Sequence, residues 1–196
     1  MANEMEKNTP DPSGWMRRLL AGDHQAFAAF VDKYKQMVFL CCRTVGLNQQ
    51  ESYDVASETF LAAYKSLDRY RFQCELSTWV WKIAYHKAVD CLRKKKQYHR
   101  LFEEVSQQPQ QQETENGIAK IENIDEAEII WQAVEHLPKL WATAIILFYR
   151  EQKSVAEIAE IMNTGQNTVK TYLFRGRSRL KELLPDAFGV DTYDNG

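Results

Sequence analysis

The chain has 196 residues and a formal net charge of −2, and this length suits one large domain or two small ones. The charge excludes a uniformly basic nucleic-acid-binding protein, so any basic surface must be local. No apolar run reaches the length needed to span a membrane, and the polar start MANEMEKNTPDPSGW lacks the apolar centre of a secretory signal. We therefore expect a cytoplasmic protein.

Cysteine and histidine spacing argues against metal chemistry and catalysis. None of Cys41, Cys42, Cys74 and Cys91 is spaced as CxxC, and no matching histidine pair is present. In a reducing cytosol we expect small buried hydrophobic residues, with redox sensing or zinc binding as the alternative. No HExxH, paired-carboxylate or P-loop spacing occurs. We expect that the chain is not an enzyme and uses neither a metal nor a cofactor.

Three helices are predicted in the first third of the chain. Residues 1–12 are polar with two prolines and are expected to be a disordered tail. A short helix follows and ends at Gly22. Asp23 caps a second helix that runs to Val45, and a third spans about 50–65. Apolar residues recur at threes and fours on the second and third helices, which predicts buried stripes of Phe27, Phe30, Val31, Tyr34, Val38 and Cys41, and of Tyr53, Ala56, Phe60 and Tyr64.

A longer helix is predicted over residues 77–96, with Ser77 or Thr78 as its cap. Its buried stripe is expected to contain Val80, Ala84, Ala88 and Cys91, flanked by Trp81 and Leu92. The opposite face carries Lys82, His86 and Arg93, with Trp79 among them. A tryptophan on a cationic face suits a platform for a nucleic-acid base, beside charges that neutralise phosphate. The alternative is that Trp79 is half-buried against the preceding loop and the following lysines form a solvated helix end.

Charge is distributed unevenly around this helix. Nine basic residues and only two acidic ones lie between Arg69 and Arg100. The following segment is acidic and contains SQQPQQQETENG, a composition typical of a flexible linker. We expect an all-α chain of two small helical domains, the first a helical bundle, joined by this acidic flexible linker. The expected bounds are 13–102 for the first domain, 103–124 for the linker, 125–185 for the second domain and 186–196 for a tail.

The second predicted domain contains a helix-turn-helix. Ser154 and Glu157 form a capping box that opens a short helix. The turn Asn163-Thr-Gly165 then leads into a longer helix over about 166–184. Its outward face carries Asn167, Thr171, Phe174, Arg175 and Ser178, flanked by Lys170 and Arg177. Such a face can enter the major groove of duplex DNA. The alternative is a plain helical hairpin, which does not explain the cap, the turn and the basic face together.

Three stretches resemble sigma factors of bacterial RNA polymerase, the sigma-70 superfamily, and within it the extracytoplasmic-function (group 4) type. AGDHQAFAAFVDKYKQMVF is similar to the family's first conserved helix. SETFLAAYKSLDRYR and STWVWKIAYHKAVDCLR resemble the polymerase-docking helix and the promoter-melting helix. LPKLWATAIILFYREQKSVAEIAEIMNTGQNTVKTYLFRGRSRLKELL resembles the C-terminal helix-turn-helix domain. The resemblance covers nearly everything except the tails and the linker.

The resemblance implies a region 2 domain that binds core RNA polymerase and melts the −10 promoter element as single-stranded DNA. Its docking helix would contact the clamp helices of the largest subunit. The matching positions are Asp54, Glu58, Thr59, Phe60, Leu61 and Tyr64. The expected −10 contacts are Arg69, Arg71, Phe72, Trp79, Lys82, Tyr85, His86 and Arg93. The loop 72–76 would hold an extruded base, whose lost stacking is offset by aromatic contacts and hydrogen bonds.

The same resemblance implies a region 4 domain that reads the −35 element as duplex DNA. The expected contacts are Asn167, Lys170, Thr171, Phe174, Arg175 and Arg177. Further partners implied by the family are the flap of the second-largest polymerase subunit and an anti-sigma factor. Departures from the family pattern at Ser57, His86, Gly165 and Asn167 leave the promoter sequence open more than the function. The rival hypothesis is a stand-alone helix-turn-helix transcriptional regulator, which would leave the aromatic and basic first domain unexplained.

Overall fold

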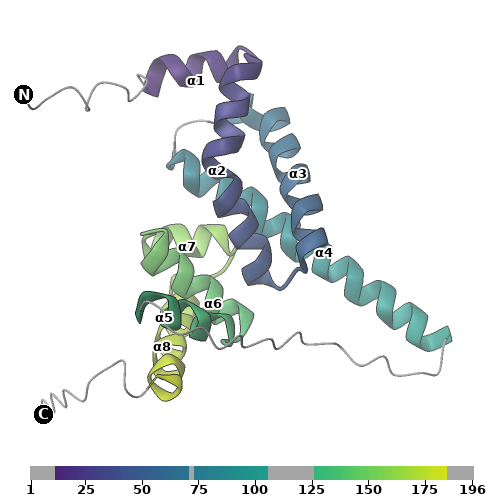
Figure 1. Cartoon of the computed structure of the whole chain (residues 1–196), viewed down its shortest axis with the longest axis vertical. Coiled ribbons are helices and arrows are strands. Elements are labelled where there is room, and N and C mark those ends of the chain that lie inside the picture. Colours follow the sequence, from purple (N-terminus) through teal and green to yellow (C-terminus); the bar gives the residue numbers. More distant parts are fainter. Residues whose placement is uncertain (1–11, 71–72, 106–125, 185–196) are drawn as a thin grey trace, which may run out of the picture.

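The computed structural model describes residues 12–70, 73–105 and 126–184, and the regular elements in these ranges are all helical (Figure 1). They are α1 (Pro12–Leu20), α2 (His24–Val45), α3 (Gln49–Ser66), the 3-10 helix η1 (Leu67–Arg69), α4 (Leu76–Val105), α5 (Glu126–Glu135), α6 (Lys139–Ile145), the π-helical turn η2 (Ile146–Arg150), α7 (Val155–Ile161) and α8 (Gln166–Leu183). None of these described helices is both long and apolar enough to cross a membrane. The predicted tails and linker lie outside the described residues, except for Pro12 and residues 103–105. The prediction of an all-α chain with two helical domains is confirmed.

The first domain is a bundle in which α2, α3 and α4 pack against one another and α1 contacts α2. The bundle has an aromatic core because the ring of Phe30 lies 5.3–5.9 Å from those of Phe27, Tyr34 and Phe60. Aromatic pairs of this kind add to the stabilisation that comes from burial alone. Trp81 of α4 is fully buried. The core is therefore assembled from all three long helices.

Local sequence signals set the helix ends of the first domain. The Asp23 carboxylate accepts hydrogen bonds from two backbone N–H groups of α2 at 2.8 and 3.2 Å, which confirms the predicted cap. Gly46 ends α2 with a φ of 112°, a conformation that favours glycine. Asn48 and Glu51 form a capping box at the start of α3 that the sequence analysis missed, although Asn followed three residues later by Glu is its usual signal.

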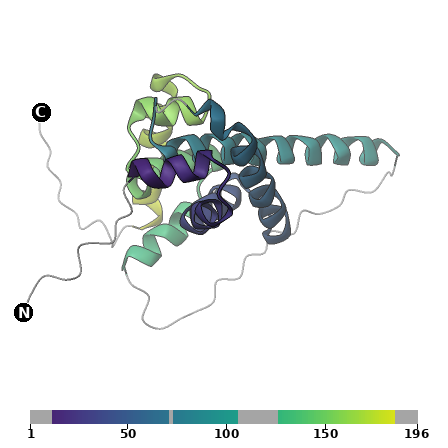
Figure 2. The same cartoon turned by 90° about the horizontal axis from the view of Figure 1, so that it is seen from above.

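The helix α4 differs from its prediction at both ends. It begins at Leu76, before the predicted cap, and continues to Val105 instead of ending near residue 96. The C-terminal part projects away from the other helices (Figures 1 and 2). Lysine, glutamine, leucine and glutamate occur in this part and have good helix propensity, which favours continuation of the helix. The first three residues of the predicted linker are therefore helical.

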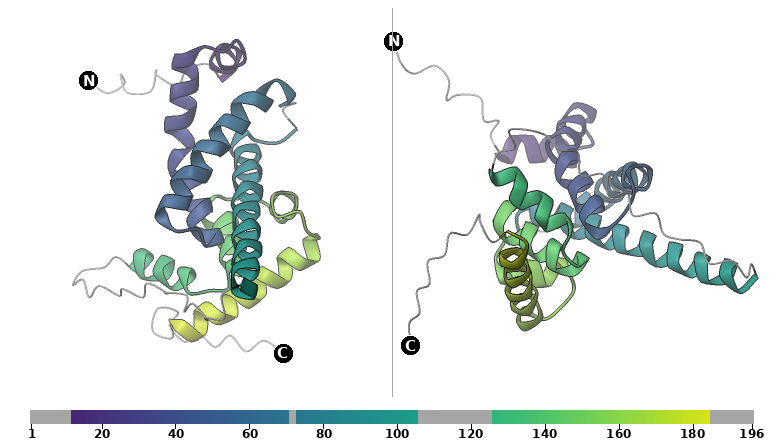
Figure 3. Two further views of the ribbon diagram at one scale, coloured as in Figure 1. Left: turned by 90° about the vertical axis from the view of Figure 1, so that its right-hand side faces the viewer. Right: turned by 60° about the horizontal axis from the view of Figure 1, so that its bottom comes forward.

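In the second domain, α8 packs against α5, α6 and α7 (Figure 3). The predicted capping box of α7 is confirmed, since the Ser154 N–H donates to the Glu157 carboxylate at 3.0 Å and the Glu157 N–H donates to Ser154 Oγ at 3.2 Å. Gly176 allows α8 to approach α6 closely, because a Cβ atom there would lie 2.9 Å from Cγ1 of Ile145. The helix-turn-helix therefore rests on a tightly packed support.

The cysteines divide into two buried and two partly exposed residues. Cys41 and Cys42 are buried, as predicted, whereas Cys74 and Cys91 are only partly covered. Burial raises the pKa of Cys41 and raises the pKa of Cys42 to about 12. Both buried thiols are therefore protonated and unreactive at neutral pH.

Candidate nucleic-acid interface

The outer side of α3 presents four of the six residues predicted to bind polymerase. The exposed four are Asp54, Glu58, Leu61 and Tyr64. Thr59 is fully buried, and its hydroxyl donates to the Val55 carbonyl at 2.7 Å. Phe60 packs edge-on against Phe30 in the core. Thr59 and Phe60 lie on the inward stripe of α3 and are covered in this fold, so their direct contact with polymerase stays a prediction.

The predicted cationic face of α4 is partly open. Lys82 and His86 are partly exposed and Arg93 is exposed. Trp79 is half-buried, with its ring centroid 5.4 Å from that of Tyr70. The alternative hypothesis, which placed this tryptophan against the preceding loop, describes its packing. Trp79 keeps part of its surface accessible, so stacking on a base remains a prediction.

Two further predicted −10 contacts differ in accessibility. Arg69 is exposed at the end of η1. Tyr85 is buried, and burial, followed by the neighbouring Cys41 and by Tyr172 of α8, raises the pKa of its phenol. Tyr85 is therefore covered in this structure, and its contact with the −10 element stays a prediction. Arg71 and Phe72 lie outside the described residues.

Four basic residues of α4 are paired with carboxylates. The pairs are Lys82 with Glu160 at 2.7 Å, Lys87 with Glu58 at 3.2 Å, Arg93 with Asp90 at 3.1 Å and Lys95 with Glu51 at 2.6 Å. Partly exposed pairs of this kind are typically worth only about 0–1 kcal/mol. A DNA phosphate can therefore compete for these cations.

The helix α8 keeps an open polar face. The exposed predicted residues are Asn167, Lys170, Thr171, Phe174 and Arg175, and Phe174 leaves 69% of its surface accessible. Val169, Leu173, Gly176 and Leu180 are buried on the inward side. The Arg175 guanidinium lies 6.0 Å from the ring of Trp141. The outward face can therefore contact DNA without disturbing the core.

Arg177 is held away from the centre of this face. Its Nε donates to the Tyr149 hydroxyl at 2.8 Å, and its guanidinium lies 5.6 Å from the ring of Phe148. It borders an apolar groove of about 480 Å³ between α5, α6, η2 and α8 that the sequence analysis missed. The groove is lined by Ile130, Trp131, Val134, Ile145, Tyr149, Arg177, Leu180 and Lys181. Arg177 therefore belongs to the rim of this groove in the structure.

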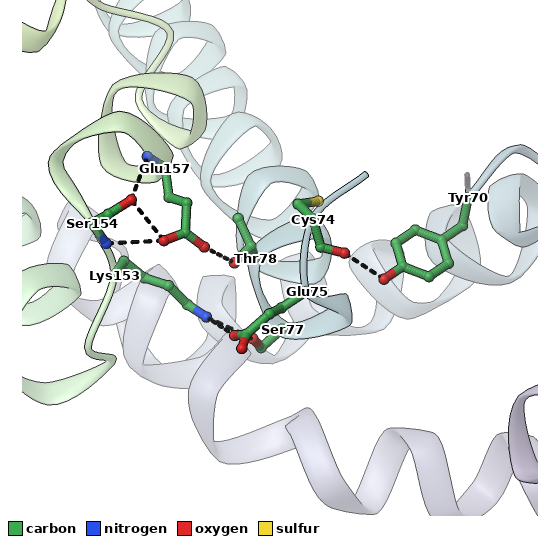
Figure 4. A network of polar contacts seen from close by, with 8 residues as sticks. All are labelled: Tyr70, Cys74, Glu75, Ser77, Thr78, Lys153, Ser154 and Glu157. Atoms are coloured by element: carbon green, nitrogen blue, oxygen red, sulfur yellow. Dashed lines mark hydrogen bonds and ion pairs between the residues drawn. The ribbon is translucent and has the colours of Figure 1, made fainter. Parts of the chain in front are cut away.

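The two domains meet where α4 begins. Helix α7 contacts α4, and α6 contacts α2. Lys153, just before α7, donates from Nζ to Glu75 Oε2 at 2.7 Å and to Ser77 Oγ at 2.8 Å (Figure 4). Thr78 Oγ1 donates to Glu157 Oε1 at 2.9 Å. Ser77 and Thr78 thus bind the second domain and do not cap α4, which corrects their predicted role.

This contact is partly buried and lowers the pKa values of two carboxyl groups. Only 1% of Thr78 and 5% of Lys153 are accessible. The hydrogen bond from Lys153 and its charge lower the pKa of Glu75. Burial raises the pKa of Glu157, but hydrogen bonds from Ser154 and Thr78 and the charge of Lys153 outweigh it and lower the pKa. No local sequence pattern predicts such a contact, because Lys153 and Glu75 are far apart in the sequence.

Sequence comparisons match both domains. The family model "Sigma-70 region 2" matches residues 30–98, and "Sigma-70, region 4" matches residues 127–180. The ECF RNA polymerase sigma factor SigW of Bacillus subtilis is 35% identical, and the match covers 87% of this chain and 95% of that protein. The RNA polymerase sigma-H factor of Pseudomonas aeruginosa is 28% identical over 86% of this chain and 91% of its own length.

Solved structures show the same fold. The sigma factor RpoE of Bartonella quintana, in complex with the anti-sigma factor NepR, has a TM-score of 0.65 at 19% identity and covers 82% of this chain and 97% of its own. CnrH in complex with the cytosolic domain of CnrY has a TM-score of 0.58 at 19% identity, covering 87% and 95%.

The two helical domains and the match of both to family models define a sigma factor. The chain belongs to the sigma-70 family, and within it to the extracytoplasmic-function type. It directs RNA polymerase to promoters, as the sigma factors of this family do. Sigma factors are initiation factors without an enzymatic reaction of their own.

Proposed function

We propose that the two domains divide promoter recognition, with α4 melting and holding the −10 element and α8 reading the −35 element as duplex DNA. The observation that supports this division is the presence of two different surfaces on one chain, an aromatic and cationic helix and a polar recognition helix. Single-stranded bases stack on aromatic rings, whereas a helix in the major groove reads the base edges of a duplex. Each surface thus suits one form of the promoter.

On the −10 side, Trp79 supplies aromatic surface next to the charges of α4. Lys82, His86 and Arg93 lie along the same helix, and Arg69 lies just before it. These groups can neutralise the phosphates of a separated strand. Tyr85 joins this set only if it becomes accessible, and Arg71 and Phe72 keep their predicted place in it.

For polymerase, we propose two docking sites. The outer side of α3 suits the clamp helices, because Leu61 and Tyr64 supply apolar surface next to the charges of Asp54 and Glu58. The groove beside α8 suits an amphipathic helix of the flap, since apolar walls are bordered by Arg177 and Lys181. The domain bounds that we propose are those expected from the sequence, with α4 extended to residue 105.

An anti-sigma factor is a further proposed partner. The structural relative RpoE was solved with the anti-sigma factor NepR, and this chain shares its fold. We propose no enzymatic reaction for the chain. A stand-alone regulator is not favoured, because its function would not require the region 2 domain that this chain contains.

Run-off transcription with purified core polymerase tests the proposal. A library of promoter fragments is transcribed with and without the protein. We expect new start sites preceded by two shared, spaced sequence elements. Clear duplex binding by the protein alone, without any new start site, would instead support the stand-alone regulator.

The Trp79→Ala variant tests the melting step separately. We expect impaired formation of the open complex, measured by permanganate reactivity of unpaired thymines, with unchanged binding to core polymerase. Trp79→Phe keeps an aromatic ring and should retain most melting activity. Unchanged melting by Trp79→Ala would remove this residue from the −10 surface.

A further inference from the structure

The polar contacts between the domains run along one side of α4 and one side of α7. Thr78 and Lys82 are four residues apart and share one side of α4, while Glu157 and Glu160 are three apart and share one side of α7. Thr78 bonds Glu157 at 2.9 Å, and Lys82 bonds Glu160 at 2.7 Å. Lys153 extends the line to Glu75 at 2.7 Å. The first turns of α4 are thus covered by the first helix of the helix-turn-helix.

The contact includes Lys82, one of the residues proposed to hold the melted strand. The Glu160 carboxylate forms an ion pair with the ammonium group of Lys82, which could otherwise bind a phosphate. The loop side of α4 is engaged as well, through Glu75 and Ser77. By contrast, Phe174 and Arg175 on the recognition face of α8 stay exposed. The contact engages the start of the proposed −10 surface and leaves the recognition face of α8 open.

We infer that this contact is a closed state of the free chain, in which α7 stands in for the promoter strand on α4. The inference rests on the proposed role of α4 in melting. In the closed state the chain can bind duplex DNA through α8, but the −10 strand must displace α7. Melting therefore requires the two domains to separate.

A second contact supports the closed state. A Cβ atom on Gly46, at the end of α2, would lie 3.5 Å from Lys139 Cε at the start of α6. Tyr85 of α4 is buried with Tyr172 of α8 close to it. The domains thus touch beyond the polar line.

The chemistry of the contact makes it reversible. Lys82 and Glu160 keep 40% and 55% of their side-chain surfaces accessible, so salt weakens their attraction. Lys153 and Thr78 are well covered but carry polar groups that water can satisfy after separation. Polymerase or DNA can therefore compete for the polar part of this contact and favour the open state.

Zero-length cross-linking of the full chain tests the closed state directly. A carbodiimide joins amines to carboxylates that are already in contact, and mass spectrometry identifies the products. We expect Lys82–Glu160 and Lys153–Glu75 products in the free chain and their loss when core polymerase is bound. The Lys95–Glu51 pair, which lies within the first domain, is the internal control. Control products without interdomain products in the free chain, or interdomain products that persist on polymerase, would overturn the inference.

The charge reversal Glu160→Lys tests the consequence. We expect loss of the Lys82–Glu160 product and tighter binding of a single-stranded −10 oligonucleotide taken from a promoter found by run-off transcription. If the open form is about one-tenth of the free chain, affinity should rise about tenfold. Glu135→Lys, at the end of α5, changes the net charge equally and is the matched control. A rise no larger than that of the control would contradict the closed state.

A paired reversal separates this inference from the proposed function. Lys82→Glu combined with Glu160→Lys recreates the ion pair in opposite sense and should restore a cross-link between positions 82 and 160. This readout uses no DNA. If the cross-links behave as expected but no variant binds the −10 strand, the proposed role of α4 fails while the closed contact stands.

Discussion

The helices α4 and α8, which we propose to contact DNA, are built differently. On α8 the buried residues and the proposed DNA contacts lie on separate sides, as the neighbours Arg175 and Gly176 show. On α4 the two sets overlap, because Trp79 packs on Tyr70 and Tyr85 is buried. A helix that reads duplex DNA can keep its recognition face apart from its core. A helix that captures separated bases with aromatic rings draws those rings from the edge of the core.

The largest expected effect is on the core side of α4. Trp81→Ala should destabilise the first domain by about 3–5 kcal/mol, because it removes a fully buried ring and leaves a cavity. Chemical denaturation of the full chain measures this loss. Trp81→Phe should cost clearly less, since the Trp81 Nε1 has no hydrogen-bond partner among the described residues. Equal losses for the two variants would contradict the cavity explanation.

The core side of α8 should be sensitive to added volume. Gly176→Val should destabilise the second domain by about 1–3 kcal/mol, because its side chain must displace Ile145. Thermal unfolding of the full chain reports the loss. Ser178→Val, on the exposed side of the same helix, is the matched control and should change stability much less. Similar losses would mean that the two sides of α8 are not separated as described.

Substitutions on the outward side of α8 should change DNA recognition but leave the stability of the protein unchanged. Arg175→Ala should cost about 1–3 kcal/mol of binding to a matched −35 duplex, with an unchanged unfolding midpoint. Fluorescence anisotropy with matched and scrambled duplexes gives the preference. Arg179→Ala removes the same charge from a residue that pairs with Glu182, and should weaken both duplexes alike. An unchanged preference for the matched duplex would remove Arg175 from the base contacts.

The smallest expected effect is the loss of stability at low pH when Glu157 becomes protonated. Its pKa lies below the ordinary value of 4.5, so its contribution is complete above that value and is lost as the pH falls through the lowered pKa. The unfolding midpoint of the native chain should exceed that of Glu157→Gln by a constant margin from about pH 8 to about pH 5 and by less below. A margin that changes between about pH 8 and about pH 6 would mean that another group is responsible.

Short-range signals predicted much of the architecture. Asp23, Ser154 and Gly165 occupy the helix starts expected of them, because a cap depends only on neighbours within one turn. Helix α4 continues beyond its predicted end because charged residues with high helix propensity do not terminate a helix. Thr59 and Phe60 were placed on a surface by resemblance, whereas the i+4 pattern of α3 places them in the core.

The sequence by itself determined the family, the two helical domains, the caps at Asp23 and Ser154 and the polar face of α8, because each of these depends on local pattern or on motifs shared along the chain. The tertiary structure alone decided that Tyr85 is buried, that Arg177 turns to Tyr149, and that Ser77 and Thr78 bond the second domain. These outcomes depend on residues more than twenty positions away. Periodicity gives the direction in which a side chain leaves its helix, but only packing decides what it meets there.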